Sequence, residues 1–382
     1  MAFKDRLVKY AEIERIRSRP LIVYVTSSRQ NAEGNLAPDA LPVLIDQLLL
    51  MPPGQTKADL LIVSNGGDPT VAWRIMTLLR ERVDAVGVLI PQAAFSAATL
   101  IALGADEIVM HPCGNLGPVD PQITVQRIRP GTNEKELMSF GSEDLAGFLR
   151  FIRESVGLSD QEYLKSAFEL FCKEAGAVPI GVATRASQLS VSMGEKLLRM
   201  HMKGDAEGQK AKAIAEALNT KFFHHGYPVG RKEAKEIGLK VAEPSADLER
   251  LIWEVWLDLE GEMKCRTPFN PMDEIAQSPL AAQLFANIPQ VTVPSGFPPE
   301  LMQMAAQQIL QQISVVQLPA VDFELRQAMI ESPRMACAYV TNGKIFARRE
   351  TDLKISLNRS KLRCERFCQN SFQPMTSNPF RK

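Results

Sequence analysis

Ser96 is the residue with the clearest capacity for covalent chemistry. It follows a buried apolar run, residues 85–90, and precedes a stretch of small residues, 97–103, that favours a helix. The first N–H groups of a helix lack intrahelical partners and carry the positive end of its dipole, so they stabilise negative charge. A serine oxygen that attacks a carbonyl generates such charge, but an ordinary N-cap explains the same position. Both roles stay open at this point.

The pair Gly66-Gly67 is the second feature with chemical potential. It lies directly after another apolar run and before a helical segment. Glycine tolerates positive φ and leaves neighbouring N–H groups unhindered. If one of these N–H groups converges with that of Ala97 beside Ser96, the two form an oxyanion hole. The alternative is a plain strand-to-helix turn; a phosphate loop is disfavoured because neither GxGxxG nor a GK[ST] ending is present.

The elements that must position these residues alternate between strand and helix. Nearly continuous apolar runs predict strands at 21–25, 59–64, 85–90 and 107–110. Helical patterns occupy 40–51, 70–82 and 96–103. This alternation predicts an α/β fold of repeated βαβ units around a parallel sheet that is covered on both faces. Ligands bind beyond the carboxyl ends of such strands, where the glycine pair and Ser96 both fall.

The rest of the chain divides into three predicted parts. Residues 1–20 form an N-terminal helix, 21–262 the α/β domain with helical additions, and 263–382 a C-terminal extension of unrecognised type. Further helices are expected at 143–155, 163–171, 193–202, 211–222, 247–263, 280–287 and 301–313. Residues 267–280 and 288–300 read as Pro-rich linkers. An Asn-Gly signal at Asn342-Gly343 predicts a hairpin over 340–357, and 359–382 reads as a frayed basic tail or as a contact for an acidic partner.

Composition narrows the function further. Lysine plus arginine and aspartate plus glutamate number 44 each, which argues against general binding of nucleic acid or anionic membrane. No apolar run approaches the ~20 residues of a membrane span, and the N-terminus lacks a signal-peptide core, so we expect a cytoplasmic protein. The six cysteines are scattered, although Cys364 and Cys368, at helical spacing, leave a shared metal open. We otherwise expect no metal and no cofactor.

Four stretches together resemble a known family. They read IERIRSRPLIVYVTSSRQ, SNGGDPTVAWRI, IPQAAFSAATLIALGADEIVMHPCGNLGPVDPQI and HHGYPVGRKEAKEIGLKV. They are similar to the ClpP/crotonase superfamily, and most of all to the SDH-type (serine dehydrogenase proteinase) Clp-fold serine peptidases related to signal peptide peptidase SppA. The resemblance covers roughly residues 12–260. It implies a ClpP/crotonase-like spiral core, a homo-oligomer and hydrolysis of peptide or protein substrates, with Ser96 as nucleophile and the N–H groups of Gly67 and Ala97 as oxyanion hole.

The general base is where the sequence departs from the family pattern. ClpP-like members carry a histidine where this chain has Val119 and Asp120, and His111 lies too early to replace it. Lys135 matches the position of the SppA-like lysine, but the adjacent glutamates favour its charged form, and a surface role is the alternative.

His225 is the other candidate base, because histidine titrates near neutral pH. It can equally serve only to orient its loop through Tyr227. Asp120 either orients a base or caps a turn.

Two other classes of function remain open at this stage. A scaffold or adaptor would keep the fold without a working base and act through residues 264–382. A crotonase-like enzyme acting on acyl thioesters would use the same two N–H donors without a nucleophile. Fold alone does not decide among them.

Overall fold

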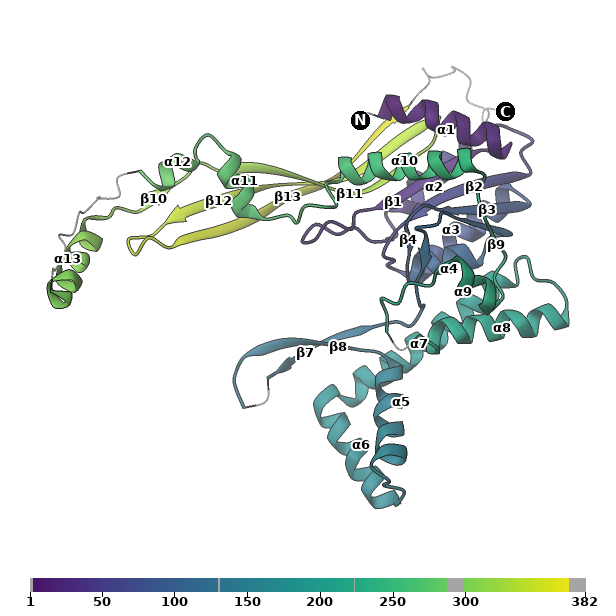
Figure 1. The fold of residues 1–382 in the computed structure, drawn as a ribbon, viewed down its shortest axis with the longest axis horizontal. Helices are drawn as coiled ribbons and strands as arrows, with labels where there is room; N and C mark the ends of the chain where they lie inside the picture. The colour runs from purple at the N-terminus through teal and green to yellow at the C-terminus, as the bar shows by residue number, and fades with distance from the viewer. Residues whose placement is uncertain (1–2, 130, 223, 287–297, 371–382) are drawn as a thin grey trace, which may run out of the picture.

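We analysed the protein in a computed structural model, which describes all residues except 1–2, 130, 223, 287–297 and 371–382 (Figure 1). The described strands build a nine-stranded main sheet in the order β10-β12-β11-β1-β2-β3-β5-β9, with β13 pairing β12. Its parallel part consists of β1 (Leu21–Thr26), β2 (Lys57–Val63), β3 (Ala85–Ile90), β5 (Glu107–Met110) and β9 (Val241–Ala242). The predicted α/β class is therefore confirmed.

Helices cover both faces of this parallel part. One face carries α2 (Ala40–Leu49), α3 (Pro69–Arg82) and α4 (Ala97–Leu103), and the other α1 (Phe3–Arg17) and α10 (Ala246–Glu262). Side chains alternate along each strand: Ile22 and Tyr24 of β1 pack into the first cluster, whereas Val23 lies in the second. Burial on both faces explains why these strands read as unbroken apolar runs.

A helical projection follows the small-residue helix α4. The hairpin of β7 (Ile123–Ile128) and β8 (Lys135–Phe140) leads into α5 (Ser142–Arg150), the π-helical turn η1 (Phe151–Ser155) and α6 (Gln161–Ala175), which extend below the sheet (Figure 1). The chain returns through α7 (Ala177–Leu198), α8 (Asp205–Thr220) and α9 (Arg231–Ile237); α7 packs against α4. Along the described stretches, no helix is long and apolar enough to cross a membrane.

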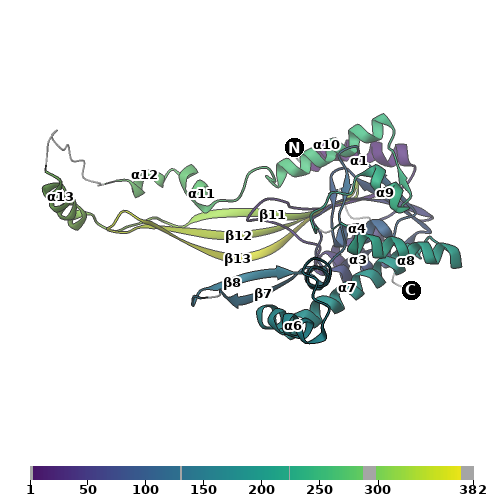
Figure 2. The ribbon, with the colours of Figure 1, turned by 60° about the horizontal axis from the view of Figure 1, so that its bottom comes forward.

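The C-terminal region extends the main sheet. β11 (Val321–Glu331) pairs antiparallel with β1, and β12 (Met335–Arg349) and β13 (Ile355–Asn370) continue the ribbon outward (Figures 1 and 2). The short elements α11 (Pro271–Gln277), α12 (Ala281–Leu284) and β10 (Val316–Gln317) lie along this ribbon, and α13 (Pro299–Gln312) lies at its far end. A small core that includes Phe269, Ile275, Phe323 and Ile345 holds it together.

Two sequence predictions for this region are wrong. The strand β12 continues through Asn342-Gly343, where its pairing with β13 shifts register, and the hairpin turn lies at residues 350–354. Gly343 makes room for a neighbour: a Cβ at this position would lie 2.3 Å from the Phe323 ring. The segment 267–280 also contains helix α11, started by Pro271 and capped by Asn270, and is not a plain linker.

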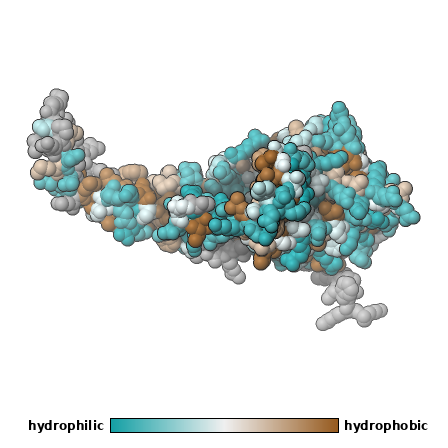
Figure 3. Space-filling model, turned by 90° about the horizontal axis from the view of Figure 1, so that it is seen from below, coloured by the Kyte–Doolittle hydropathy of each residue, from teal (hydrophilic) through white to brown (hydrophobic). Residues whose placement is uncertain are grey.

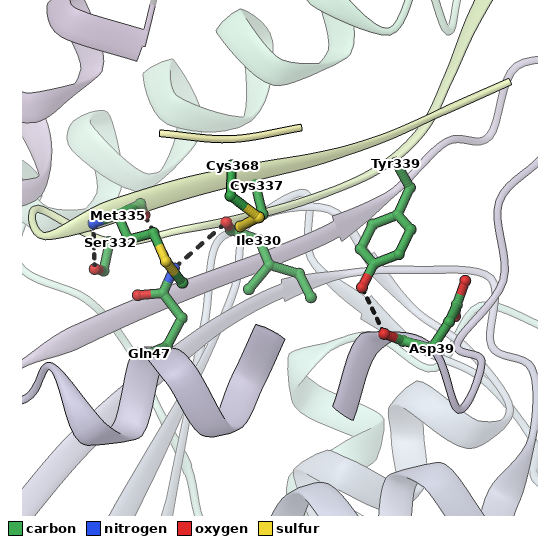
Figure 4. Close-up of a disulfide and its surroundings, with 8 residues drawn as sticks. All are labelled: Asp39, Gln47, Ile330, Ser332, Met335, Cys337, Tyr339 and Cys368. Carbon is green, nitrogen blue, oxygen red and sulfur yellow. Dashed lines mark hydrogen bonds between the residues drawn. A yellow bond between two sulfur atoms is a disulfide. The ribbon is translucent and has the colours of Figure 1, made fainter. Parts of the chain in front are cut away.

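Residues 359–370 of the predicted basic tail belong to strand β13 and are not frayed; residues 371–382 lie outside the described part. Cys364 and Cys368 therefore lack the helical spacing that a shared metal required. Cys368 instead forms a disulfide with Cys337 on the neighbouring strand (Figure 4). Disulfides persist mainly in oxidising compartments, so this bond and the expected cytoplasmic location point in opposite directions.

Buried polar contacts attach the ribbon to the core. Gln47 of α2 donates its Nε2–H to the carbonyl oxygens of Met335 and Ile330, at 2.9 and 3.4 Å (Figure 4). On the opposite face, the fully buried Arg6 of α1 donates to both carboxylate oxygens of Glu331, at 3.0 and 2.7 Å, and Tyr10 donates to the same carboxylate. A buried ion pair is costly to break because the remaining charge loses its partner.

Replacing Glu331 should therefore destabilise the whole fold. We expect Glu331→Ala to lower the free energy of unfolding by about 3 kcal/mol, measured by urea denaturation. Glu236→Ala, which removes an exposed i,i+4 partner of Lys232, is the control and should leave stability nearly unchanged. Equal effects of the two variants would contradict the anchoring of α1 on β11.

Candidate active site

A second, smaller layer of paired backbone lies beyond the carboxyl ends of the parallel strands. Its centre is the parallel pair of β4 (Ala93–Ala94) and β6 (Asn115–Leu116). Single bridges extend it on both sides: Ser64 pairs with Ala94, Gly67 with Leu36, and Leu116 with Val229. Five chain segments thus lie edge to edge. Every residue predicted for the site except Lys135 belongs to this layer or lies within four residues, along the chain, of a residue that is paired in it.

Ser96 occupies a strained position between β4 and α4. Its backbone has φ 52° and ψ −118°, and a positive φ is uncommon for a residue with a side chain. Strain of this kind persists only where the surroundings enforce it, and it gathers at functional sites. The half-buried Ser96 side chain does not cap the helix, and its hydroxyl has no hydrogen-bond partner among the described residues. The capping role therefore does not explain this serine.

Gly66 lies against Ser96 so closely that a larger residue does not fit. A Cβ on Gly66 would be 2.7 Å from the Ser96 Cβ and 2.8 Å from the Phe95 carbonyl oxygen. The φ of Gly66 is also positive, at 106°. Its own N–H is occupied, since it donates to Ser64 Oγ at 3.1 Å. Gly66 thus serves to bring the two turns together.

The N–H group of Gly67 points away from its backbone partner Leu36. The Leu36 N–H donates to the Gly66 carbonyl at 2.8 Å, so that carbonyl points toward Leu36. Because the peptide is trans, the N–H of Gly67 points the opposite way, away from Leu36. The N–H groups of Gly67 and Ala97 both lack an acceptor within the part of the chain described. Two such donors beside a serine are the elements of an oxyanion hole.

The close approach of Gly66 predicts a specific cost for adding a side chain. We expect Gly66→Ala to lower the free energy of unfolding by about 1–3 kcal/mol more than Gly54→Ala, because overpacking adds to the strain of positive φ. Gly54 is a matched control, since its φ is 75° but no atom lies within 4 Å of an added Cβ. Chemical denaturation of both variants measures the difference; equal losses would show that the close approach is absent.

His225 and Asp120 form a hydrogen-bonded pair on the same layer. His225 Nδ1 lies 2.9 Å from Asp120 Oδ1, and this hydrogen bond raises the pKa of His225 above its ordinary value. The backbone register explains this contact. Leu116 pairs antiparallel with Val229, so Asp120, four residues after Leu116, lies opposite His225, four residues before Val229. Of the two roles predicted for Asp120, the structure therefore shows contact with an imidazole, in addition to any role in the turn. Sequence reasoning named both residues but did not pair them.

The nucleophile candidate and this pair lie at the same end of three neighbouring segments. Ala94 is level with Leu116, and a Cβ on Gly117 would meet the Phe95 ring at 2.8 Å, so the turn that contains Ser96 adjoins Gly117. Within the described chain, no hydrogen bond joins Ser96 to His225. The arrangement brings a free serine hydroxyl, two N–H donors and a carboxylate-bound histidine to one edge.

The structure does not bring Lys135 to this edge. It is exposed and pairs with Ile128 at the far end of the hairpin, whereas the Ile123–Phe140 pair lies at the near end. Five residues of strand separate the two ends, roughly 17 Å at 3.3 Å per residue.

His111 is also outside the site. It is buried at the end of β5, stacks on Trp253 with ring centroids 4.7 Å apart, and has its pKa lowered by burial. No group of three or more His, Cys, Asp or Glu side chains among the described residues is placed to hold a metal.

These features define an α/β protein with a serine at a strained strand-to-helix turn beside a glycine turn. Residues 44–130 match the family model described as "ClpP-like SDH-type serine proteinase", so this segment is similar to that family. The matched residues include Gly66, Gly67, Ser96 and Asp120, and the family resemblance read from the sequence is confirmed.

Relatives and a solved structure extend the comparison. Two uncharacterized proteins of Methanocaldococcus jannaschii are 26% identical over 204 residues and 25% identical over 190 residues. These matches cover 53% and 50% of this chain and 57% and 54% of the relatives, so the chain spans about half the length of the curated relatives it matches. A variant of the membrane-bound stomatin-specific protease 1510-N matches 61% of this chain and 84% of its own, at 14% identity and a TM-score of 0.34.

Proposed function

We propose that this protein is a serine peptidase that hydrolyses peptide bonds through an acyl-enzyme on Ser96. The observation that carries the proposal is the strained, uncapped Ser96 held against the glycine turn. The N–H groups of Gly67 and Ala97, which adjoin Gly66 and Ser96 in the chain, are the proposed donors. Such donors stabilise the oxyanion of a tetrahedral intermediate.

His225 acts as general base in this mechanism, with Asp120 as its positioning residue. Asp120 binds Nδ1, so Nε2 is the nitrogen left to accept the Ser96 proton. The serine oxygen attacks the peptide carbonyl, the oxyanion accepts from Gly67 and Ala97, and the imidazolium returns its proton to the leaving amine. Water, activated by the same imidazole, then hydrolyses the acyl-enzyme. Lys135 is the rival base, and only another subunit's lysine or a rearranged hairpin would bring it to Ser96.

A homo-oligomer is part of this proposal. Large hydrophobic side chains are exposed on the helical projection, where Figure 3 shows hydrophobic patches on the face seen from below. They include Leu137, Phe151, Tyr163, Phe168, Leu170 and Val178. Exposed apolar patches of this kind mark interaction surfaces. We assign them to contacts between copies of this chain.

Labelling with a fluorophosphonate tests the nucleophile. We expect one covalent adduct per chain on the wild-type protein by intact-mass analysis, and none on Ser96→Ala. Ser245→Ala is the matched control, since this serine does cap its helix and donates nothing to the site. His225→Ala should slow labelling strongly, whereas Lys135→Ala should leave it unchanged.

The rival functions give different results in the same experiment. A folded, assembled protein without an adduct contradicts the peptidase and favours the scaffold. Binding of an acyl-coenzyme A thioester together with no adduct favours the crotonase-like enzyme. Loss of labelling with Lys135→Ala but not His225→Ala would assign the base to the lysine.

The pH dependence of hydrolysis tests the His225–Asp120 pair. A base must be neutral to accept a proton, so kcat/KM should rise with pH and inflect above the ordinary histidine pKa of about 6.5, because Asp120 raises the pKa of His225. Asp120→Asn removes the carboxylate, so the inflection should move to lower pH and kcat/KM should fall by about 10²–10⁴-fold. Asp84→Asn, at an exposed position outside the site, should change neither; an unshifted inflection in Asp120→Asn contradicts the pairing.

A further inference from the structure

A cavity of about 460 Å³ opens directly beside the His225–Asp120 pair. Its wall is formed by the loop that follows β6, by α5, by the end of α8 and by the loop that carries His225. The volume lies within the range of ligand-binding pockets. Pro118, two residues beyond the Leu116 that pairs with Ala94, is also part of the wall. Because His225 itself lines the cavity, a substrate bound at Ser96 and His225 would lie next to it.

The charges of the wall favour a cation. Three carboxylates line the cavity, from Asp120, Glu143 and Asp144, against one guanidinium, from Arg150, and the imidazoles of His224 and His225. Asp120 is already bound to His225, so Glu143 and Asp144 are the carboxylates left for a ligand. Arg150 approaches Glu143 only to 3.7 Å, and both side chains are partly exposed, so the pair is weak. Asp144 accepts from the Gly141 N–H at 2.6 Å at the start of α5.

Asn219 adds an independent sign that the wall is built for a ligand. Its side chain is 4% exposed and lines the cavity. Its Oδ1 accepts from Ser187 at 2.9 Å, whereas its Nδ2 has no hydrogen-bond partner within the described residues. A buried donor without an acceptor is costly, which favours a ligand that supplies an oxygen.

We propose that this cavity binds a lysine or arginine side chain of the peptide substrate close to the scissile bond. A basic peptide residue supplies both groups that the wall lacks: a cationic head for Glu143 and Asp144, and a main-chain carbonyl oxygen for Asn219. This inference deepens the proposed peptidase function and rests on it. It names the substrate class as peptides with a basic residue near the cleaved bond.

Peptide binding to the Ser96→Ala protein tests the inference without turnover. The probes are peptides of one sequence in which lysine or the uncharged norleucine is moved through each position in turn. At one position we expect the lysine peptide to bind about threefold to fivefold more tightly than the norleucine peptide. Glu143→Gln should reduce this ratio toward one, whereas Glu154→Gln, an exposed glutamate outside the cavity, should leave it unchanged. Added salt should also lower the ratio.

The outcomes separate this inference from the peptidase proposal. Equal binding of the lysine and norleucine peptides at every position, a ratio unchanged in Glu143→Gln, or no peptide binding at all overturns the cavity assignment. If Ser96 of the wild-type protein still reacts with a fluorophosphonate in that case, the peptidase stands and only the basic specificity fails. A lysine preference abolished by Glu143→Gln, on a protein whose Ser96 does not react, supports the cavity and contradicts the peptidase.

Discussion

The contact between Gly66 and Ser96 is the constraint on which the site depends. Two strand-to-helix turns meet there with both residues at positive φ, and no room remains for a Cβ on the glycine. The approach holds the serine at the start of α4 against the glycine turn. Each turn is held by backbone contacts with other segments. Leu36 is hydrogen-bonded to the glycine turn, and Ala94, just before Ser96, pairs with both Ser64 and Leu116. The small layer of paired backbone holds both turns in place, and this is why the strained backbone of Ser96 persists in the folded chain.

The main sheet positions this layer, because the carboxyl ends of its parallel strands all lie at one edge and lead into the paired segments. Its C-terminal ribbon is joined to the core at both faces, through Gln47 on one side and through Arg6 and Tyr10 on the other. The chain outside the family match is therefore integrated into the same sheet as the site. The helical projection has a different character: it has a small core of its own and also exposes several large hydrophobic side chains, which suits the proposed contacts between subunits.

Local patterns predicted the core elements well, and long-range pairing explains what they missed. The strands β1, β2, β3 and β5 are buried on both faces and read as apolar runs, and the glycine pair and Ser96 follow them directly. The ribbon was missed because Asn342-Gly343 is a local turn signal, which pairing with β11 and the packing of Phe323 override. The Asp120–His225 contact spans 105 residues and depends on the Leu116–Val229 register, which no short pattern encodes.

A crystal structure of the protein reacted with a peptide boronic acid tests the central claim most directly. The account predicts boron bonded to Ser96 Oγ, one boronate oxygen about 2.7–3.1 Å from the N–H groups of Gly67 and Ala97, and His225 Nε2 beside the serine oxygen. A boronate whose oxygens contact neither N–H, or a Lys135 side chain of any subunit in the place assigned to His225, would contradict it.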